Sequence, residues 1–293
     1  MELTLVILAA GMGSRFGDKK QLVGFGPAGQ LLPEYSIYDA VKAGFNRILW
    51  IIQESDRKAF DEALAKSHWD VPMDFAYQDL RAVPEGIVIP EERQKPWGTA
   101  HALLAAAPKI KGPFAIINAD DYYGPSAYQA LADFLRSDRP EIAMVLGYEL
   151  GKTLSGHGSV TRGVLETKDG KLQAIAETSG LRLEGAEIVD NEGRQYSASC
   201  PISMNAWAFK PEILTWLSER NERFFREIFP ENPLRSEFFL PEFVEELIRE
   251  EALDVLVMPC SEQWFGVTHK EDREKLEAEL RAMHERGLYP KTF

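Results

Sequence analysis

Three glycines and a group of cations follow the first apolar run of the chain. The sequence LAAGMGSRFGDKKQL, at residues 8–22, contains Gly11, Gly13, Arg15 and Lys20. Glycines tolerate positive φ angles and let backbone N–H groups approach a ligand closely. An arginine can bind phosphate oxygens through two N–H groups, and a lysine supplies a point charge. The combination predicts a loop that binds phosphates.

The spacing of the glycines separates this loop from two common nucleotide-binding motifs. The Walker A pattern GxxxxGK[ST] is absent, and the spacing G-x-G-x-x-x-G differs from the dinucleotide fingerprint G-x-G-x-x-G. A nicotinamide-dependent oxidoreductase is therefore disfavoured. A purely structural turn is the alternative to a ligand-binding loop, but the two cations favour phosphate binding.

Two adjacent acids end a later apolar run. Asp120 and Asp121 lie in the sequence PFAIINADDYYG, at residues 113–124. Carboxylates at the end of a strand can hold Mg²⁺ while substrate phosphates complete its coordination. The alternative is a turn before a helix, because Pro125 and Ser126 follow. We expect Asp120 to bind the metal, with Asp121 as the second candidate.

The elements that must position these residues alternate between strands and helices. The predicted strands are residues 3–9, 47–53, 73–78, 113–118 and 142–150, and the predicted helices are residues 31–45, 56–67, 98–110 and 126–137. This alternation predicts an α/β fold with three αβα layers around a mainly parallel, Rossmann-like sheet. Ligands of such sheets bind outside the carboxyl ends of the strands, where the glycine loop and Asp120 both fall.

The pattern changes in the second half of the chain. The sequence at 163–178 predicts two strands joined by an Asp-Gly turn. A strand and the start of a helix are predicted at 201–214, and the mostly helical tail contains one strand-like run at 253–259. We find no Pro/Gly/Ser linker, repeat or low-complexity segment, so the sequence predicts one continuous domain.

Composition excludes several classes of function. The formal net charge of −13 argues against nucleic acid as the main partner. The five histidines form no HxH or HxxxH pair, which argues against zinc. Cys200 and Cys260 fit no CxxC pattern and are expected to be buried thiols. No apolar run approaches the roughly 20 residues of a membrane span, and the N-terminus does not resemble a signal peptide, so we expect a cytoplasmic protein without membrane contact.

Six motifs together identify a family resemblance. They are LAAGMGSRFGDKKQL, KPWGTAHAL, NADDYYG, AIAETSG, SMNAWAF and EQWFGVTHKED, in this order along the chain. The sequence resembles the sugar-1-phosphate nucleotidylyltransferases, which include glucose-1-phosphate thymidylyl- and uridylyltransferases. The resemblance implies a GT-A-like sheet with a small added β/α sugar-binding region. It also implies a single nucleotidyltransferase domain over 1–293, with 1–150 as the nucleotide-binding half and 151–293 as the sugar-phosphate-binding half with C-terminal helices.

The resemblance also implies a reaction and a set of site residues. A sugar 1-phosphate oxygen attacks the α-phosphorus of a nucleoside triphosphate, and pyrophosphate leaves, with Mg²⁺ as cofactor. The implied catalytic residues are Arg15, Lys20 and Asp120; the nucleotide-binding residues are Ala9, Ala10, Gly11, Gly13, Gln94, Gly98 and Thr99; the sugar-phosphate-binding residues are Gly163, Glu177 and Asn205; the metal ligands are Asp120 and Asp121. Each of the three sugar-side residues also has a purely structural alternative. Gly163 could be a hairpin glycine, Glu177 an exposed strand residue, and Asn205 a buried amide with its hydrogen bonds satisfied.

Two departures from the family pattern affect these assignments. Gly266 stands where the family usually has an aspartate that serves as second metal ligand, and Asp121 is the first candidate to replace it. Arg93 stands five residues before the base-pocket glycine, where many members have a glutamine, so Gln94 is taken as the base contact.

The identity of the substrates and two rival functions stay open. The sequence GTAHA favours UTP, with dTTP next, and the sugar is not readable from the sequence. A GT-A-type glycosyltransferase would share the sheet and the acids but would not need Arg15 and Lys20. A non-catalytic sugar-nucleotide sensor is compatible with Gly266. The resemblance is also compatible with a homo-oligomer.

Overall fold

One mixed sheet of eleven strands forms the centre of the computed structural model, which describes residues 1–11, 22–156, 158–266 and 270–293. Its main part has the order β3-β2-β1-β4-β11-β6-β12. These strands are β1 (Thr4–Leu8), β2 (Arg47–Ile52), β3 (Met73–Tyr77), β4 (Phe114–Asn118), β6 (Ala143–Glu149), β11 (Pro201–Phe209) and β12 (Val255–Cys260). All run parallel except β11, which lies antiparallel between β4 and β6. The predicted mainly parallel sheet is confirmed.

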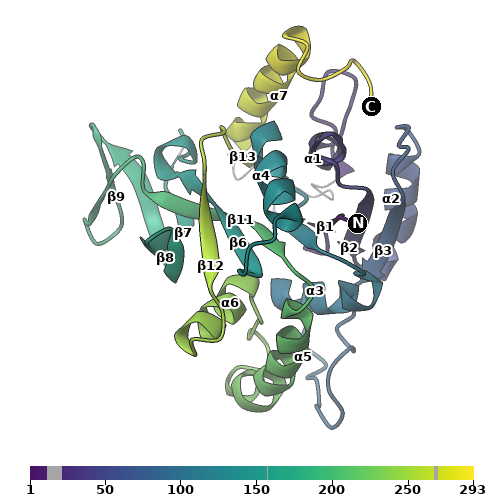
Figure 1. Cartoon of the computed structure of the whole chain (residues 1–293), viewed down its shortest axis with the longest axis vertical. Helices are drawn as coiled ribbons and strands as arrows, with labels where there is room; N and C mark the ends of the chain where they lie inside the picture. Colours follow the sequence, from purple (N-terminus) through teal and green to yellow (C-terminus); the bar gives the residue numbers. More distant parts are fainter. Residues whose placement is uncertain (12–21, 157, 267–269) are drawn as a thin grey trace.

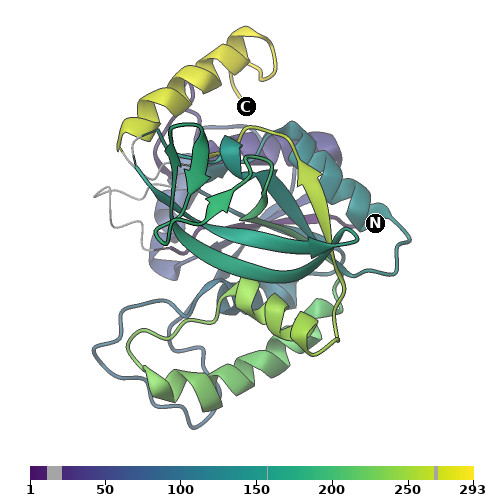
Figure 2. The ribbon, with the colours of Figure 1, turned by 90° about the vertical axis from the view of Figure 1, so that its left-hand side faces the viewer.

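Helices cover both faces of this sheet (Figures 1 and 2). One face packs against α1 (Leu32–Ala43), α2 (Arg57–Leu64) and α4 (Pro125–Arg136), and the other against α3 (Thr99–Ala106), α5 (Ile213–Arg223) and α6 (Leu240–Arg249). Alternate residues of a strand point to opposite faces, so every strand between two helical layers must be apolar throughout. Within β1, Leu5 and Ile7 join the first core and Val6 the second. The three predicted layers are therefore present.

A smaller β region extends from the main sheet. Its strands are β7 (Val160–Lys168), β8 (Lys171–Glu184), β9 (Glu187–Val189) and β10 (Gln195–Tyr196). The predicted Asp-Gly turn joins β7 and β8, with φ of 52° at Asp169 and 76° at Gly170. Because β7 also pairs with β11, this region is attached directly to the main sheet.

The C-terminal helix α7 (Lys270–Glu285) packs beside α1 and a two-stranded sheet of β5 (Asp121–Tyr122) and β13 (Phe265–Gly266). The short helical turns are η2 (Glu54–Asp56), η3 (Ala107–Lys109), η4 (Leu150–Lys152), η5 (Phe224–Ile228) and η6 (Phe229–Glu231). The helices of the described part of the chain include none long and apolar enough to cross a membrane.

A buried aspartate connects α1 to the segment after α7. Asp39 is 4% exposed and accepts a hydrogen bond of 2.7 Å from the hydroxyl of Tyr289, whose oxygen lies 2.8 Å from that of Tyr122. Burial raises the pKa of Asp39 to about 7, and the bond from Tyr289 offsets only part of that rise. The carboxyl group is thus protonated in the folded protein under conditions in which an exposed aspartate is ionised.

This shift predicts that stability falls as pH rises from about 4 to 7. In that range the folded state retains the proton of Asp39 and the unfolded state has lost it, so folding is favoured at the acidic end. The side chain of Asp39→Asn cannot ionise. Its free energy of unfolding, relative to that of the parent protein, is therefore expected to be about 3 kcal/mol higher at pH 8 than at pH 5. Urea unfolding at both pH values measures this, with the exposed Asp138→Asn as control. A gain that is the same at both pH values would contradict the assignment.

Candidate active site

Two cavities, each of about 430 Å³, meet at Asn118, where β4 ends. The first cavity is lined by residues that follow β1 and by the N-terminus of α3. The second is lined by β7, β8, β11 and α6. Both lie at the carboxyl-end edge of the parallel strands, where the sequence analysis expects the ligands.

The first cavity brings together five of the predicted nucleotide-side residues. They are Ala10, Gly11, Gly98, Thr99 and Asp120. Ala9 is buried at the end of β1, where its N–H donates to the carbonyl of Ile51 at 2.8 Å, and it does not line the cavity. The side-chain amide of Gln53 donates to the carbonyl of Ala10 at 3.1 Å, which fixes the start of the glycine loop. Gly13, Arg15 and Lys20 lie outside the described residues.

Gly98 is required by its backbone and by its neighbours. Its φ of 96° is unfavourable for a residue with a Cβ, and a Cβ there would lie 2.5 Å from the carbonyl oxygen of Phe238. The same carbonyl accepts the N–H of Ala100 at 3.0 Å, and the hydroxyl oxygen of Thr99 accepts the N–H of Leu240 at 2.9 Å. The N-terminus of α3 is therefore held tightly against the segment before α6.

Arg93 is an anchor for the loop 79–97 rather than a ligand-binding residue. Its side chain donates to the carbonyls of Lys95, Pro96, Pro233 and Ser236 at 2.7–3.2 Å. It also lies 3.6 Å from the centre of the Trp97 ring, within the range of a cation–π contact. These contacts tie the loop to the segment between α5 and α6.

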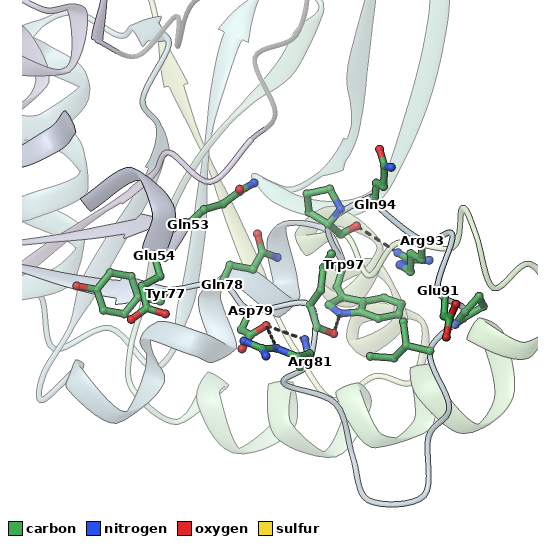
Figure 3. A pocket seen from close by; sticks show the side chains of 14 residues that line it. Gln53, Glu54, Tyr77, Gln78, Asp79, Arg81, Glu91, Arg93, Gln94 and Trp97 are labelled. Atoms are coloured by element: carbon green, nitrogen blue, oxygen red, sulfur yellow. Dashed lines mark hydrogen bonds and ion pairs between the residues drawn. The ribbon is translucent and has the colours of Figure 1, made fainter. Parts of the chain in front are cut away.

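Gln94 is exposed and lines a third cavity, of about 640 Å³, under the same loop. Figure 3 shows Gln53 and Gln78 on one side of the third cavity and Gln94 on the other. Gln94 is not among the residues that line the first cavity, so the structure does not place it with the other predicted nucleotide-side residues.

Gln78 is a residue that the sequence analysis missed. It directly follows β3, lines both the first and the third cavity, and donates its amide Nε2–H to the carbonyl of Gly98 at 3.0 Å. The available signal was a polar side chain at the carboxyl end of a parallel strand. The contact between Gln78 and Gly98 could not be predicted from the sequence, because the loop 79–97 separates the two residues along the chain.

The two adjacent aspartates have different surroundings. Asp120 lines the first cavity. Asp121 is 7% exposed, and its Oδ2 accepts hydrogen bonds from the amide of Asn118 at 2.9 Å and the hydroxyl of Tyr123 at 3.2 Å. Asp121 does not line the first cavity, and its assignment as a metal ligand stays a prediction.

The oxygen donors at the first cavity fit a magnesium ion that is bound mainly through substrate. Mg²⁺ typically uses one or two carboxylates together with phosphate oxygens and water, and Asp120 supplies one carboxylate. Within the described residues no cluster of three or more His, Cys, Asp or Glu side chains could hold a metal by itself.

Position 266 has no room for a further carboxylate. Gly266 pairs with Asp121 across the β5–β13 ladder. A Cβ on Gly266 would lie 2.3 Å from the Trp264 ring and 3.0 Å from Oδ1 of Asp121. An aspartate at this position would therefore require Trp264 to move.

The second cavity brings together the three predicted sugar-side residues. Gly163 and Glu177 face each other across the β7–β8 ladder, and both line this cavity with Asn205. A Cβ on Gly163 would lie only 3.1 Å from a methyl group of Ile175. Glu242, from α6, is a lining residue that the sequence analysis missed, and burial, with the nearby charge of Glu177, raises its pKa.

Asn205 lines the second cavity and is hydrogen-bonded to Asn118, the residue that both cavities share. It has φ of 58° at an irregularity in the pairing of β11 with β6, and asparagine tolerates this left-handed conformation better than most residues. Its Nδ2–H donates to Oδ1 of Asn118 at 2.8 Å, and its Oδ1 accepts the indole N–H of Trp207 at 3.0 Å. Such strained positions are typical of functional sites.

Comparison with known proteins places this arrangement in context. A family model described as nucleotidyl transferase matches residues 4–230. The inositol-1-phosphate CTP transferase from T. maritima superimposes with a TM-score of 0.64 at 13% identity, over 94% of this chain and 95% of that one. A putative glucose-1-phosphate thymidylyltransferase from Bacillus anthracis gives 0.62 at 14% identity, over 95% of each chain. A UDP-glucose pyrophosphorylase gives 0.63 at 15% identity, over 98% of this chain and 100% of that one. A search of curated proteins gave no significant match.

Proposed function

The chain belongs to the nucleotidyl transferase family, and from this we propose that it condenses a nucleoside triphosphate with a sugar 1-phosphate. The products are a nucleotide sugar and pyrophosphate. The observation that carries the proposal is the meeting of two cavities at Asn118, one beside the glycine loop and the other beside Asn205. UTP is the favoured nucleotide and dTTP the next. The similar structures are named for CTP, thymidylyl and UDP substrates, so their names leave the base open.

The chemistry needs alignment and charge neutralisation more than covalent help from the protein. An oxygen of the sugar phosphate forms a bond to the α-phosphorus while the bond from that phosphorus to the bridging oxygen breaks. Pyrophosphate leaves with the bonding electrons. Arg15 and Lys20 stabilise the negative charge on the reacting phosphates. Magnesium, when bound with Asp120, would supply further positive charge at these phosphates.

The two substrates are held by different parts of the chain. Gly11, Gly98 and Thr99 line the space for the nucleotide. Gln78, which lines the same cavity, takes the role of base contact that the sequence analysis gave to Gln94. The side chain of Asn205 lines the second cavity and donates a hydrogen bond to Asn118, which both cavities share, so we assign it to the sugar phosphate.

The proposed activity is tested by pyrophosphate release. Each of the four ribonucleoside triphosphates and dTTP is combined with a panel of sugar 1-phosphates, with Mg²⁺ or with EDTA. The proposal predicts release that requires one triphosphate, one sugar phosphate and the metal together. In a parallel assay with nucleotide sugars as donors, release of a free nucleoside diphosphate would instead support the glycosyltransferase. Binding without turnover across the panel would support the sensor.

A further inference from the structure

The imidazole of His101, in α3, is buried and held by the loop 79–97. The side chain is 2% exposed and lies beside the rings of Trp97 and Phe225, whose centres are 6.3 and 6.1 Å from its own. Its Nε2 lies 2.8 Å from the carbonyl oxygen of Ala82. A carbonyl only accepts hydrogen bonds, so Nε2 must carry the hydrogen. Burial lowers the pKa of His101, which favours the neutral ring, and a neutral ring with hydrogen on Nε2 leaves Nδ1 as an acceptor.

This tautomer fixes the direction of the Gln78 amide. One end of that amide faces two acceptors: the carbonyl oxygen of Gly98 at 3.0 Å and Nδ1 of His101 at 3.4 Å. Only the NH₂ group can occupy this end, because the amide oxygen would meet lone pairs on both sides. Both N–H groups of Gln78 are thus directed at the protein. The described residues provide no hydrogen-bond partner for its Oε1, and Gln78 lines the first cavity.

We propose that His101 is a positioning residue that, with the Ala82 carbonyl, locks the Gln78 amide so that it presents an acceptor to the nucleotide base. The inference rests on the proposed function, because that function assigns the first cavity to a nucleoside triphosphate. A locked acceptor favours a base that presents a ring N–H. The N3–H of uracil or thymine satisfies it, whereas the N3 of cytosine is itself an acceptor. Figure 3 shows Gln78 among the residues that line the third cavity.

Nucleotide binding tests the lock without knowledge of the sugar. Affinities for UTP and N3-methyl-UTP, which lacks the N–H, are measured by calorimetry with Mg²⁺. The parent protein is expected to bind UTP about 100-fold more tightly than the methylated analogue. His101→Phe keeps the ring packing and removes one of the two acceptors that hold the NH₂ group, so this preference should fall by about 2- to 10-fold. Arg81→Ala, an exposed change in the same loop, should preserve the preference. An equal affinity of the parent protein for both nucleotides, or an unchanged preference in His101→Phe, would overturn the proposal.

The tautomer provides a readout that is independent of nucleotide binding. Long-range ¹H–¹⁵N spectra of ¹⁵N-histidine-labelled protein at pH 7 should show a ring with hydrogen on Nε2 and a bare Nδ1, and this signal should be missing in His101→Phe. A ring with hydrogen on Nδ1, or on both nitrogens, would overturn the lock even if the variant fails to fold. If UTP does not bind but the expected tautomer is found, the assignment of UTP fails while the locked geometry stands.

Discussion

Replacing Lys20 or Arg15 with alanine is expected to lower the kcat for pyrophosphate release by about 10²–10³-fold each. Both cations are assigned to the phosphates whose charge is redistributed as the α-phosphorus is attacked. An interaction that strengthens in the transition state contributes to kcat, so the loss should fall there rather than on the KM for the sugar phosphate.

The neighbouring Lys19→Ala provides a matched control, because it removes the same charge from the same loop at a position with no assigned role. It should retain turnover within a few fold of the parent protein. Near-normal turnover in both Lys20→Ala and Arg15→Ala would remove the main reason for reading residues 8–22 as a phosphate loop. An equal loss in all three variants would indicate a general dependence on positive charge.

Gly98→Ala is expected to reduce kcat/KM for the nucleotide by about 100-fold or more, equivalent to about 3 kcal/mol. The added Cβ would lie 2.5 Å from the carbonyl oxygen of Phe238, so the backbone at the N-terminus of α3 must shift. This shift would also displace the Gly98 carbonyl that holds Gln78.

Gly86→Ala separates this clash from ordinary backbone strain. Gly86 has a similar positive φ of 84°, but a Cβ there would meet no atom within 4 Å. Both variants force an alanine into a positive-φ conformation, which costs about 1–3 kcal/mol of folding stability, and only Gly98→Ala should also lose nucleotide affinity. Similar kinetics in the two variants would contradict the role of Gly98 in shaping the cavity.

The layers of the fold could be predicted because they depend on local pattern. Strands buried on both faces must be apolar throughout, so a run such as RILWII can be recognised as a buried strand from the sequence alone. The position of β11 could not be predicted in this way. Its apolar sequence gives the strand but not its antiparallel place between β4 and β6, which results from pairing between distant segments.

The site was predictable where a residue type is required by its position. Gly98 is of this kind, because its φ of 96° is unfavourable for a residue with a Cβ, and it lines the first cavity together with Asp120. The expected base contact was placed on Gln94 by counting back from Gly98, but the cavity is lined by Gln78 at the end of β3. The sequence does not reveal the contact between Gln78 and Gly98, because the loop 79–97 separates them along the chain, and the role of Gln94 stays a prediction. The role of Arg93 as an anchor was equally hidden, since its four carbonyl partners include distant Pro233 and Ser236.

The central claim is that the chain transfers a nucleotidyl group, and the fate of labelled phosphorus tests it most directly. UTP labelled with ³²P at the α or the γ position is incubated with Mg²⁺, the protein and the sugar 1-phosphates that support pyrophosphate release. The account predicts that the α label is recovered in the nucleotide sugar and the γ label in pyrophosphate. Recovery of the γ label on the sugar, or of the α label only in free nucleotide, would show that a different bond is broken and would contradict the account.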